Sequence, residues 1–425
     1  MRKLVRNALA GLFGFGRLKT LSIVTLSHGF VAVAFFLQMG FLARILTVAR
    51  FGELATAMAI AGVAEASINA RGAETALAAF AGLTDEPIER RLQLTRKLFR
   101  LDFFWNTSIY AVLVAAVLIA DQIRDTHSSL LLLIMLGGLL SFPWGTAKGY
   151  MTVFLGSRSF APVEISYAAT TLLGGVGLAY CFGAIGFAAA LVAASTVRSV
   201  VALWVIRLSP RTLLAAVDDP DVIGRKTIWR FGASGTLRAM LVNLVLQMDL
   251  LLLAATSGPA AAGLYRAAKT LTGVTQRLSQ PVWVVLKRPI IVGAQSGARD
   301  QSQRFVFVTA AIFALAGAVL LPPLIFYGDD VMQLAFGPKY RAAGSLLVWL
   351  LPGAWLMYAV TGWSGLFGSI SRKRASVIGL YLAQLALFGI AILAMGTTMQ
   401  AVAMATAGSQ IAVALGFWGL FLRRA

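Results

Sequence analysis

One segment of this apolar chain carries three positive charges at helical spacing. Residues 263–283 read GLYRAAKTLTGVTQRLSQPVW and contain no acidic residue. At about 100° per residue, one helical face collects six of them: Arg266, Lys269, Thr270, Gly273, Arg277 and Gln280. Guanidinium and ammonium groups bind anions, and arginine grips phosphate oxygens with two parallel hydrogen bonds. The spacing therefore predicts a cationic face suited to an anionic ligand.

Other polar residues also interrupt apolar segments. Arg238 and Asp249 are eleven residues apart, so they share a helical face and are separated by about 16 Å of rise. The remaining candidates lie nearer the N-terminus: His28, Glu65, Asn69, Arg71 and Glu74. Glu65 and Asn69 are neighbours at i and i+4. For Asp249, Glu65 and His28 two interpretations stay open, ion coupling and a role as a cavity-lining polar group or ion-pair partner.

The elements that must position these residues are membrane helices. Of the 425 residues, 59% are hydrophobic and 13% are charged, and the mean hydropathy is +0.80. Soluble domains are about half apolar and about a quarter charged, so the chain is an integral membrane protein. Its apolar runs are long and do not alternate, as in LLLIMLGGLLSFPW, which favours helices over the strands of a barrel.

We predict twelve transmembrane helices, each long enough to cross a bilayer core. Their ranges are roughly 20–43, 54–80, 102–120, 129–147, 162–182, 184–206, 229–255, 260–286, 303–326, 342–367, 375–395 and 399–421. One set of alternate loops, including both termini, carries 26 of the 37 Lys and Arg residues, and the opposite set carries five. By the positive-inside rule, both termini are cytoplasmic. The net charge of +20 thus follows from topology and gives no reason to expect nucleic-acid binding.

The other six cations fall within predicted spans: Arg71, Arg198, Arg238, Arg266, Lys269 and Arg277. A cation at the bilayer midplane costs about 2.5–3.5 kcal/mol on insertion scales. These groups should therefore line a hydrated cavity, pair with acids between helices, or extend to the membrane surface. Arg198 lies near a cytoplasmic end, where we expect it to reach the surface. The acids available within spans are Glu65, Glu74, Asp102, Glu164 and Asp249.

A short internal repeat divides the chain. Leu37-Gln38-Met39 in the first span matches Leu246-Gln247-Met248 in the seventh, and a glycine follows each triplet, at Gly52 and Gly263. We predict an N-terminal lobe of six helices (1–207), a cytoplasmic linker (208–228) and a C-terminal lobe of six helices (229–425). An even number of spans in each half makes the repeat parallel, and parallel halves with a site between them are a transporter design.

Three segments resemble a known family. They are ARFGELATAMAIAGVAEASINARGAETAL (49–77), DLLLLAATSGPAAAGLYRAAKTL (249–271) and FGPKYRAAGSLLVWLLPGAWLMYAVTGWSGLFGSISRKR (336–374). They are similar to elements of polysaccharide transporters, in the oligosaccharide-lipid flippase branch of the multidrug/oligosaccharidyl-lipid/polysaccharide exporter superfamily. The resemblance implies an all-α membrane fold with two six-helix, MATE-like lobes around a central cavity.

The resemblance also implies a function. Such proteins move undecaprenyl-diphosphate-linked oligosaccharide across the bacterial cytoplasmic membrane by alternating access, for O-antigen, capsule or exopolysaccharide assembly. Polysaccharide polymerases and glycosyltransferases are then expected partners, together with membrane lipid. The candidate diphosphate-facing cations are Arg266, Lys269, Arg277, Arg238 and Arg71. Arg71 and Glu74 depart from the family pattern, which has small or apolar residues there.

Two alternatives remain open, a drug or cation antiporter of the same fold and a non-transporting scaffold for polysaccharide assembly. The first predicted span lacks the acidic residue usual in drug exporters of the superfamily, which favours the flippase. We expect no enzymatic activity, because no nucleophile and base set or phosphate-binding loop is present. No cofactor is predicted, and one cysteine and two histidines are too few for a metal site.

Overall fold

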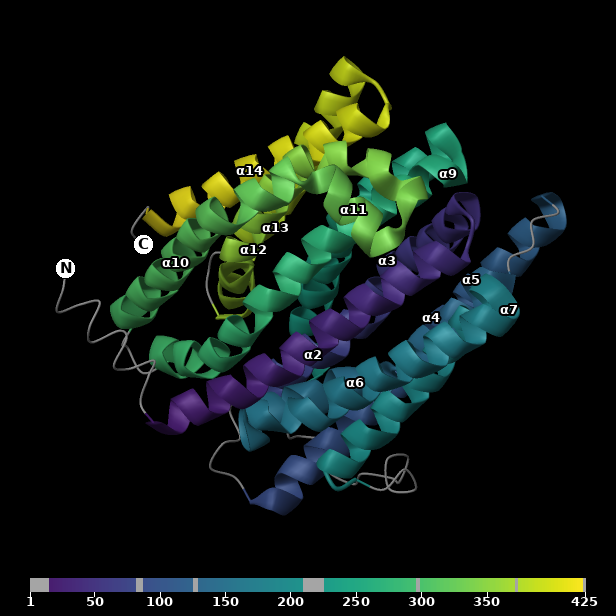
Figure 1. Ribbon diagram of the computed structural model, residues 1–425. Helices are drawn as coiled ribbons and strands as arrows, with labels where there is room; N and C mark the ends of the chain where they lie inside the picture. Colours follow the sequence, from purple (N-terminus) through teal and green to yellow (C-terminus); the bar gives the residue numbers. More distant parts are fainter. Residues whose placement is uncertain are drawn as a thin grey trace. The chain divides into compact units, whose positions relative to one another are not determined.

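The computed structural model of the chain is helical in every region that it describes (Figure 1). It describes residues 15–81, 87–124, 129–208, 225–295, 299–370 and 374–422. Side chains are described within these ranges except at 15–24, 67–79, 81, 120, 122–124, 157, 225–235, 275–295, 299–309, 361–370, 374 and 421–422.

The helices follow one another with short connections. In chain order they are α2 (Phe15–Ile45), α3 (Val48–Ala81), α4 (Ile88–Arg124), α5 (Ser129–Leu140), α6 (Phe142–Tyr150), η1 (Met151–Leu155), η2 (Ser157–Ser159), α7 (Phe160–Val205), α9 (Arg225–Gln295), α10 (Arg299–Phe326), α11 (Gly328–Phe336), η3 (Pro338–Leu346), α12 (Leu347–Ile370), α13 (Arg374–Met395) and α14 (Met399–Leu422). Each of the twelve predicted spans falls on these helices, which confirms the all-helical membrane class.

Two of the helices contain two predicted spans each. α7 breaks at Gly183 (φ 64°) and α9 breaks at Gly258 (φ 82°). Positive φ is open to glycine because it lacks a Cβ atom, so glycine allows the chain to turn between two helical arms. By length and composition, eight helices of the described residues qualify as spans, or nine if the bent pair α10–α11 counts as one. Hereafter the first arm of α9 is 225–257 and its second arm is 259–295.

The chain packs into two compact units. Unit 1 combines Met1–Gly52 with Met248–Ala425, and unit 2 is Glu53–Gln247. This division places α2 with the C-terminal helices, and it places most of the first arm of α9 with the N-terminal ones. The predicted boundaries at 207 and 229 rest on the repeat and the linker, and the six-helix lobes stay a prediction.

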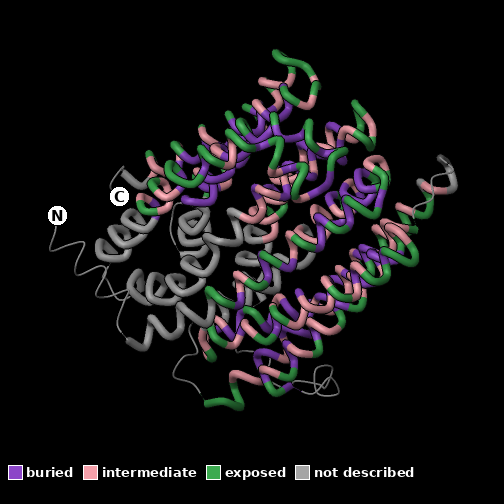
Figure 2. The backbone as a smooth tube through the Cα atoms, in the orientation of Figure 1, coloured by how far each residue is buried: buried purple, intermediate pink, exposed green. Residues whose placement is uncertain are grey.

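Unit 1 is built around a layer of long helices. α12 packs against α10, α13 and α14, and α11 packs against both η3 and α2 (Figure 1). On α13 the buried residues are Val377, Tyr381, Gln384 and Phe388, which recur at helical spacing. Most of its other positions are exposed and apolar, among them Leu393 at 89% (Figure 2). A helix with one packed stripe and an otherwise apolar surface suits a lipid environment.

In unit 2, α5 and α6 pack against α7, and α4 packs against α5 and α6. Small residues bring these helices close together. Gly137 on α5 lies next to Leu191 on α7, and a Cβ atom at Gly138 would stand 2.2 Å from the Tyr110 hydroxyl on α4. Membrane helices associate largely through such small-residue contacts, since burial of apolar surface gives them little driving force in lipid.

Candidate functional site

The second arm of α9 presents the described part of the cationic face. Arg266 and Lys269 are partly buried on this arm, and Thr270 is buried beside them. Tyr265, Ala267 and Ala268 are fully buried in unit 1. Because the arm packs through these small and aromatic residues, it holds Arg266 and Lys269 at fixed positions. The Thr270 hydroxyl donates to the carbonyl of Arg266 at 2.8 Å.

A buried carboxylate on the first arm of α9 pairs with Lys269. The Lys269 Nζ atom donates to Oδ1 of Asp249 at 2.5 Å. Asp249 is 0% exposed, and the Lys269 side chain is 14% exposed. The two residues lie at nearly equal distances in sequence before and after Gly258, so the arms of α9 fold back on each other to make this pair.

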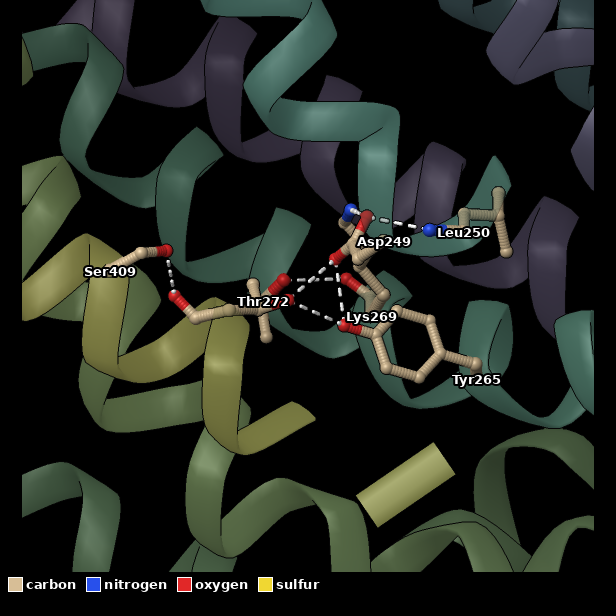
Figure 3. A network of polar contacts seen from close by, with 7 residues as sticks. Asp249, Leu250, Tyr265, Lys269, Thr272 and Ser409 are labelled. Carbon is tan, nitrogen blue, oxygen red and sulfur yellow. Dashed lines mark hydrogen bonds and ion pairs between the residues drawn. The ribbon is translucent and has the colours of Figure 1, made fainter. Parts of the chain in front are cut away.

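Three further donors surround Asp249 (Figure 3). Its Oδ2 atom accepts from the Tyr265 hydroxyl at 2.7 Å and from Thr406 Oγ1 at 3.4 Å. Its Oδ1 atom also accepts from the backbone N–H of Leu250 at 2.8 Å. Hydrogen bonds to an ionised carboxylate stabilise its charge, and this is the main way in which a buried charge becomes tolerable.

The network joins three helical segments. Asp249 comes from the first arm of α9, Tyr265 and Lys269 from the second, and Thr406 from α14. Thr406 also holds Ser409, whose hydroxyl donates to the Thr406 carbonyl at 2.9 Å. Tyr265 and Thr406 were not among the residues predicted from the sequence. Tyr265 is one residue before Arg266 and carries a polar group on an otherwise apolar sector, which was the available signal, whereas nothing in the sequence connects α14 to this site.

Apart from Glu65, the other predicted site residues fall into two groups. Arg238 on the first arm of α9 and His28 on α2 are partly buried. The side chains of Asn69, Arg71, Glu74 and Arg277 lie outside the described residues, although their backbones are helical. The structure therefore joins Asp249 to Lys269, whereas the sequence had placed Asp249 on a common face with Arg238.

Unit 2 contains carboxylates of its own. Ser141 donates to Glu65 Oε1 at 3.1 Å, and Thr146 donates to the buried Asp102. Together with Glu164 and Asp249, these are four of the five predicted intramembrane acids, and each of the four accepts a hydrogen bond from another residue. Each of these four acids thus has a hydrogen-bond donor within its own unit.

The expectation that Arg198 extends to the membrane surface is wrong. Arg198 pairs with Glu164 at 3.0 Å, and both side chains are only 18% exposed. Its guanidinium also lies over the rings of Trp144, at 4.5 Å, and Tyr167, at 4.7 Å. An acid and two aromatic faces retain the charge inside the unit, because a planar guanidinium can stack on rings while it donates to a carboxylate.

This set of charged groups is suited to binding an anion. Among residues whose side chains are described, no three His, Cys, Asp or Glu groups lie close enough to hold a metal ion. Among the described side chains of α9, the site combines Arg266, Lys269 and the Asp249 carboxylate, which other donors also hold. That combination can exchange an internal counter-ion for an external anion.

The sequence and the fold both have relatives. Residues 41–344 match the family described as "Polysaccharide biosynthesis protein". No curated protein matches the sequence. Solved structures of MATE transporters share the fold at low identity, among them a mutant of the Vibrio cholerae transporter VcmN (12% identity, TM-score 0.69, 95% of this chain and 96% of that one).

Two more such structures are the eukaryotic MATE transporter AtDTX14 and an inward-facing multidrug resistance transporter of the MOP superfamily. The first is 14% identical with a TM-score of 0.66 and covers 96% of each chain. The second is 13% identical with a TM-score of 0.64, and the match covers 94% of this chain and 96% of that one. They confirm the fold that the sequence resemblance implied. The family match spans most of the chain, so this multi-pass membrane protein belongs to the polysaccharide biosynthesis protein family and has the fold of the MATE transporters.

Proposed function

We propose that the protein is a flippase that moves polyprenyl-diphosphate-linked oligosaccharide from the inner to the outer face of a bacterial cytoplasmic membrane. The family match supports a role in polysaccharide assembly, and the MATE fold supports transport. The loop charges support cytoplasmic termini. Membrane-bound glycosyltransferases that build the passenger and a polymerase that consumes it are the expected partners.

The observation that carries the proposal is the arrangement of Arg266, Lys269 and Asp249. Arg266 lies one helical turn from Lys269 on the same arm, and an arginine binds phosphate oxygens in pairs. Lys269 is neutralised by Asp249 in this structure, so a diphosphate must displace it from that carboxylate.

The other hydrogen-bond donors around Asp249 allow it to lose Lys269. When Lys269 turns to a phosphate, the carboxylate retains the Tyr265 hydroxyl, the Thr406 hydroxyl and the Leu250 N–H as donors. A buried carboxylate with three donors keeps most of its stabilisation, whereas one with none would be strongly destabilised. Asp249 thus neutralises Lys269 when the site is empty, and Lys269 leaves Asp249 when an anionic passenger binds.

Deletion and complementation in the native host test this function. Loss of the gene should cause lipid-linked oligosaccharide to accumulate on the inner leaflet and should abolish surface polysaccharide. Complementation with Arg266→Gln or Lys269→Gln should fail to restore polymer, even though the variant protein is present in the membrane at its normal level. Arg341→Gln is the matched control, because Arg341 is a cation of the same unit whose side chain is 60% exposed. Normal polymer in the Arg266 and Lys269 variants would remove these residues from the mechanism.

The same strain separates the two alternatives. The structural likeness to multidrug transporters favours a drug exporter as the second candidate. A drug exporter predicts increased drug sensitivity and normal polysaccharide after deletion. A scaffold for assembly enzymes predicts loss of precursor synthesis instead of accumulation.

A further inference from the structure

α4 is longer than a bilayer core requires. It runs as one helix from Ile88 to Arg124, which is 37 residues, or about 55 Å of rise. A bilayer core of about 30 Å needs roughly 20 residues, and the predicted span begins at residue 102. Residues 88–101 therefore extend into the headgroup region. By the positive-inside rule this end of α4 faces the cytoplasm, because it belongs to the loops that are rich in cations.

This first part of α4 is strongly basic. Residues 88–101 contain one acid, Glu89, and five cations: Arg90, Arg91, Arg96, Lys97 and Arg100. The next acid in the chain, Asp102, is buried in unit 2 and accepts a hydrogen bond from Thr146. Clusters of four to eight cations directly beside the cytoplasmic end of a span attract anionic lipid headgroups. The composition of the segment is therefore that of a lipid-binding surface.

Three of these cations, Arg96, Lys97 and Arg100, lie on the outward side of α4. At about 100° per residue they share that side with Gln93 and Phe104, which are both exposed. Arg90 is exposed too, nearer the start of the helix. The opposite side packs into unit 2 through buried residues: Leu94, Thr95, Leu98, Phe99 and Asp102. Arg96, Lys97 and Arg100 are hereafter the outward basic face.

Arg91 belongs to the packed side instead. Its guanidinium carbon lies 4.8 Å from the centre of the Phe154 ring. A cation over the face of an aromatic ring is attracted to it, so this contact holds Arg91 within unit 2. The structure thus distinguishes Arg91, which is used in packing, from the cations of the outward basic face.

Two arginines of the outward basic face have no counter-ion within the described part of the chain. Neither Arg96 nor Arg100 makes an ion pair or a side-chain hydrogen bond there, and the Nε atom of Arg96 is buried without an acceptor. Both side chains are partly exposed. Residues four apart on a helix have Cβ atoms about 5–6 Å apart, so the two guanidinium groups can bind one phosphate together.

Apolar side chains continue the same side of the helix into the membrane. Leu101 is 45% exposed, Phe104 is 58% exposed and Val112 is 68% exposed. Of the eight candidate spans among the described residues, α4 has the smallest buried share, 17%. Cations at the level of the headgroups, followed by exposed apolar side chains, match the order of phosphate and acyl chains in a phospholipid.

We propose that the outward basic face of α4 binds the phosphate of an anionic phospholipid from the cytoplasmic leaflet, whose acyl chains lie along Leu101 and Phe104. The surplus of cations selects a headgroup with net negative charge over a zwitterionic one. A free phosphate compound would leave the exposed apolar side chains without a partner, which is why the proposal commits to a lipid. It rests on the membrane class and the charge pattern of the chain and does not require flippase activity.

Lipid binding to the purified full chain tests this directly. Phosphatidylglycerol is titrated into the protein in detergent, and the rise in the midpoint of thermal unfolding gives an apparent affinity. Phosphatidylethanolamine is the zwitterionic comparison. The parent should bind phosphatidylglycerol about tenfold more tightly than phosphatidylethanolamine. Arg96→Gln and Arg100→Gln should each lower the affinity for phosphatidylglycerol about fivefold and change that for phosphatidylethanolamine less than about twofold.

Arg91→Gln is the matched control for these variants. It removes the same charge from the same part of α4, but from the packed side. Its unfolding midpoint without lipid should fall, because the contact with the Phe154 ring is lost. Its affinity for phosphatidylglycerol should equal that of the parent. An equal loss of affinity in all three variants would show that only the total charge matters and would overturn the proposal, as would a parent that does not prefer phosphatidylglycerol.

Inorganic pyrophosphate distinguishes a lipid headgroup from a free phosphate compound. It offers phosphate oxygens without acyl chains, so it gains nothing from the apolar side chains of α4. We expect it to stabilise the parent at least about tenfold more weakly than phosphatidylglycerol does at the same concentration, because apolar burial is missing. Equal stabilisation by pyrophosphate would mean that the site recognises phosphate alone and would contradict a lipid site.

A second measurement leaves every cation in place, so it decides the question even if an arginine variant fails to fold. In a Cys181→Ser parent, a fluorophore is attached to Gln93→Cys, which is exposed on the same side of α4. In proteoliposomes, phosphatidylglycerol with a nitroxide at the top of its acyl chain should quench this label about twice as strongly as phosphatidylcholine with the same nitroxide. Equal quenching by the two lipids would refute the site.

A label at Ser345→Cys in the same parent provides the control. Ser345 is exposed on η3, near the loop that contains Lys339 and Arg341 and that the positive-inside rule places on the opposite side of the membrane. Both lipids should quench this label equally. Stronger quenching by phosphatidylglycerol at both positions would mean that the lipid gathers around the whole protein, and the site on α4 would be rejected.

These measurements are independent of the passenger. If the lipid preference is found and oligosaccharide export is absent, the lipid site stands and the proposed function fails. If export is present and no variant of the outward basic face changes lipid binding, the function stands and the lipid site fails.

Discussion

Among the described side chains, one ion pair lies within the predicted spans of each compact unit, and in each pair a different partner is supported by its surroundings. In unit 1 the acid is the supported partner, because Asp249 is fully buried and accepts from three donors besides Lys269. In unit 2 the base is the supported partner, because Arg198 lies over two aromatic rings while it pairs with Glu164.

This difference assigns the pairs different roles. A lysine whose counter-ion has other hydrogen-bond donors can leave that counter-ion and bind another anion. An arginine stacked on rings stays charged and stays in place. The Lys269–Asp249 pair is therefore suited to exchange with a ligand, and the Arg198–Glu164 pair is suited to hold α7 together.

The largest effect is expected from Asp249→Asn. Lys269 would lose its carboxylate while it remains mostly buried, and breaking a buried pair in this way costs about 3–5 kcal/mol of unfolding free energy. Adding Lys269→Gln should recover most of that stability but no oligosaccharide export. Thermal unfolding in detergent and export in a deletion strain measure the two quantities. A double variant no more stable than Asp249→Asn would contradict the pairing.

A smaller loss is expected from Arg198→Gln, about 2 kcal/mol, because the Glu164 side chain is 18% exposed and water can partly solvate it. Arg198→Lys should fall between, since it retains the charge and loses the stacking. Export per folded molecule should stay near that of the parent in both. A selective loss of export in Arg198→Lys would mean that the unit 2 pair also handles the passenger.

Tyr265→Phe removes one donor from Asp249, and we expect it to cost about 1–2 kcal/mol. Export should fall by more than the loss of folded protein explains. With one donor fewer, the Asp249 carboxylate is stabilised more by Lys269, so Lys269 leaves it less readily. Tyr340→Phe is the control: the Tyr340 hydroxyl is buried without a hydrogen-bond partner among the described residues, so its removal should be nearly neutral. The comparison of the two variants by unfolding and export isolates the hydrogen bond.

The smallest effect is expected from Arg341→Gln. Its pair with Asp330 measures 3.8 Å between exposed side chains, and such pairs contribute about 0–1 kcal/mol. Unfolding and export should both match the parent. A large loss of stability or of export would show that side-chain exposure does not distinguish the cations that bind the passenger from the other cations.

The sequence was sufficient for the helices and for the class of protein. Long apolar runs predicted the helical membrane class, because a bilayer imposes a minimum length on each helix. Eight or nine of the described helices qualify as spans, so the number twelve stays a prediction. The pairing of Asp249 with Lys269 could not be predicted from the sequence. It depends on how the two arms of α9 fold back at Gly258, and helical periodicity relates only residues on the same arm. Thr406 lies 157 residues from Asp249, and only tertiary packing brings it there. Arg198 was misjudged because position along a helix does not reveal that Glu164, Trp144 and Tyr167 surround it.

Translocation by the purified protein is the most direct test of the central claim, which is that Arg266 and Lys269 carry an anionic, lipid-linked saccharide. Proteoliposomes would contain polyprenyl-diphosphate-linked oligosaccharide, and its appearance in the opposite leaflet would be followed with a membrane-impermeant glycosidase. The account predicts transfer by the parent and by Arg341→Gln, and at least about tenfold slower transfer by Arg266→Gln and Lys269→Gln. Transfer at the parental rate in those two variants, or no transfer by the parent, would contradict it.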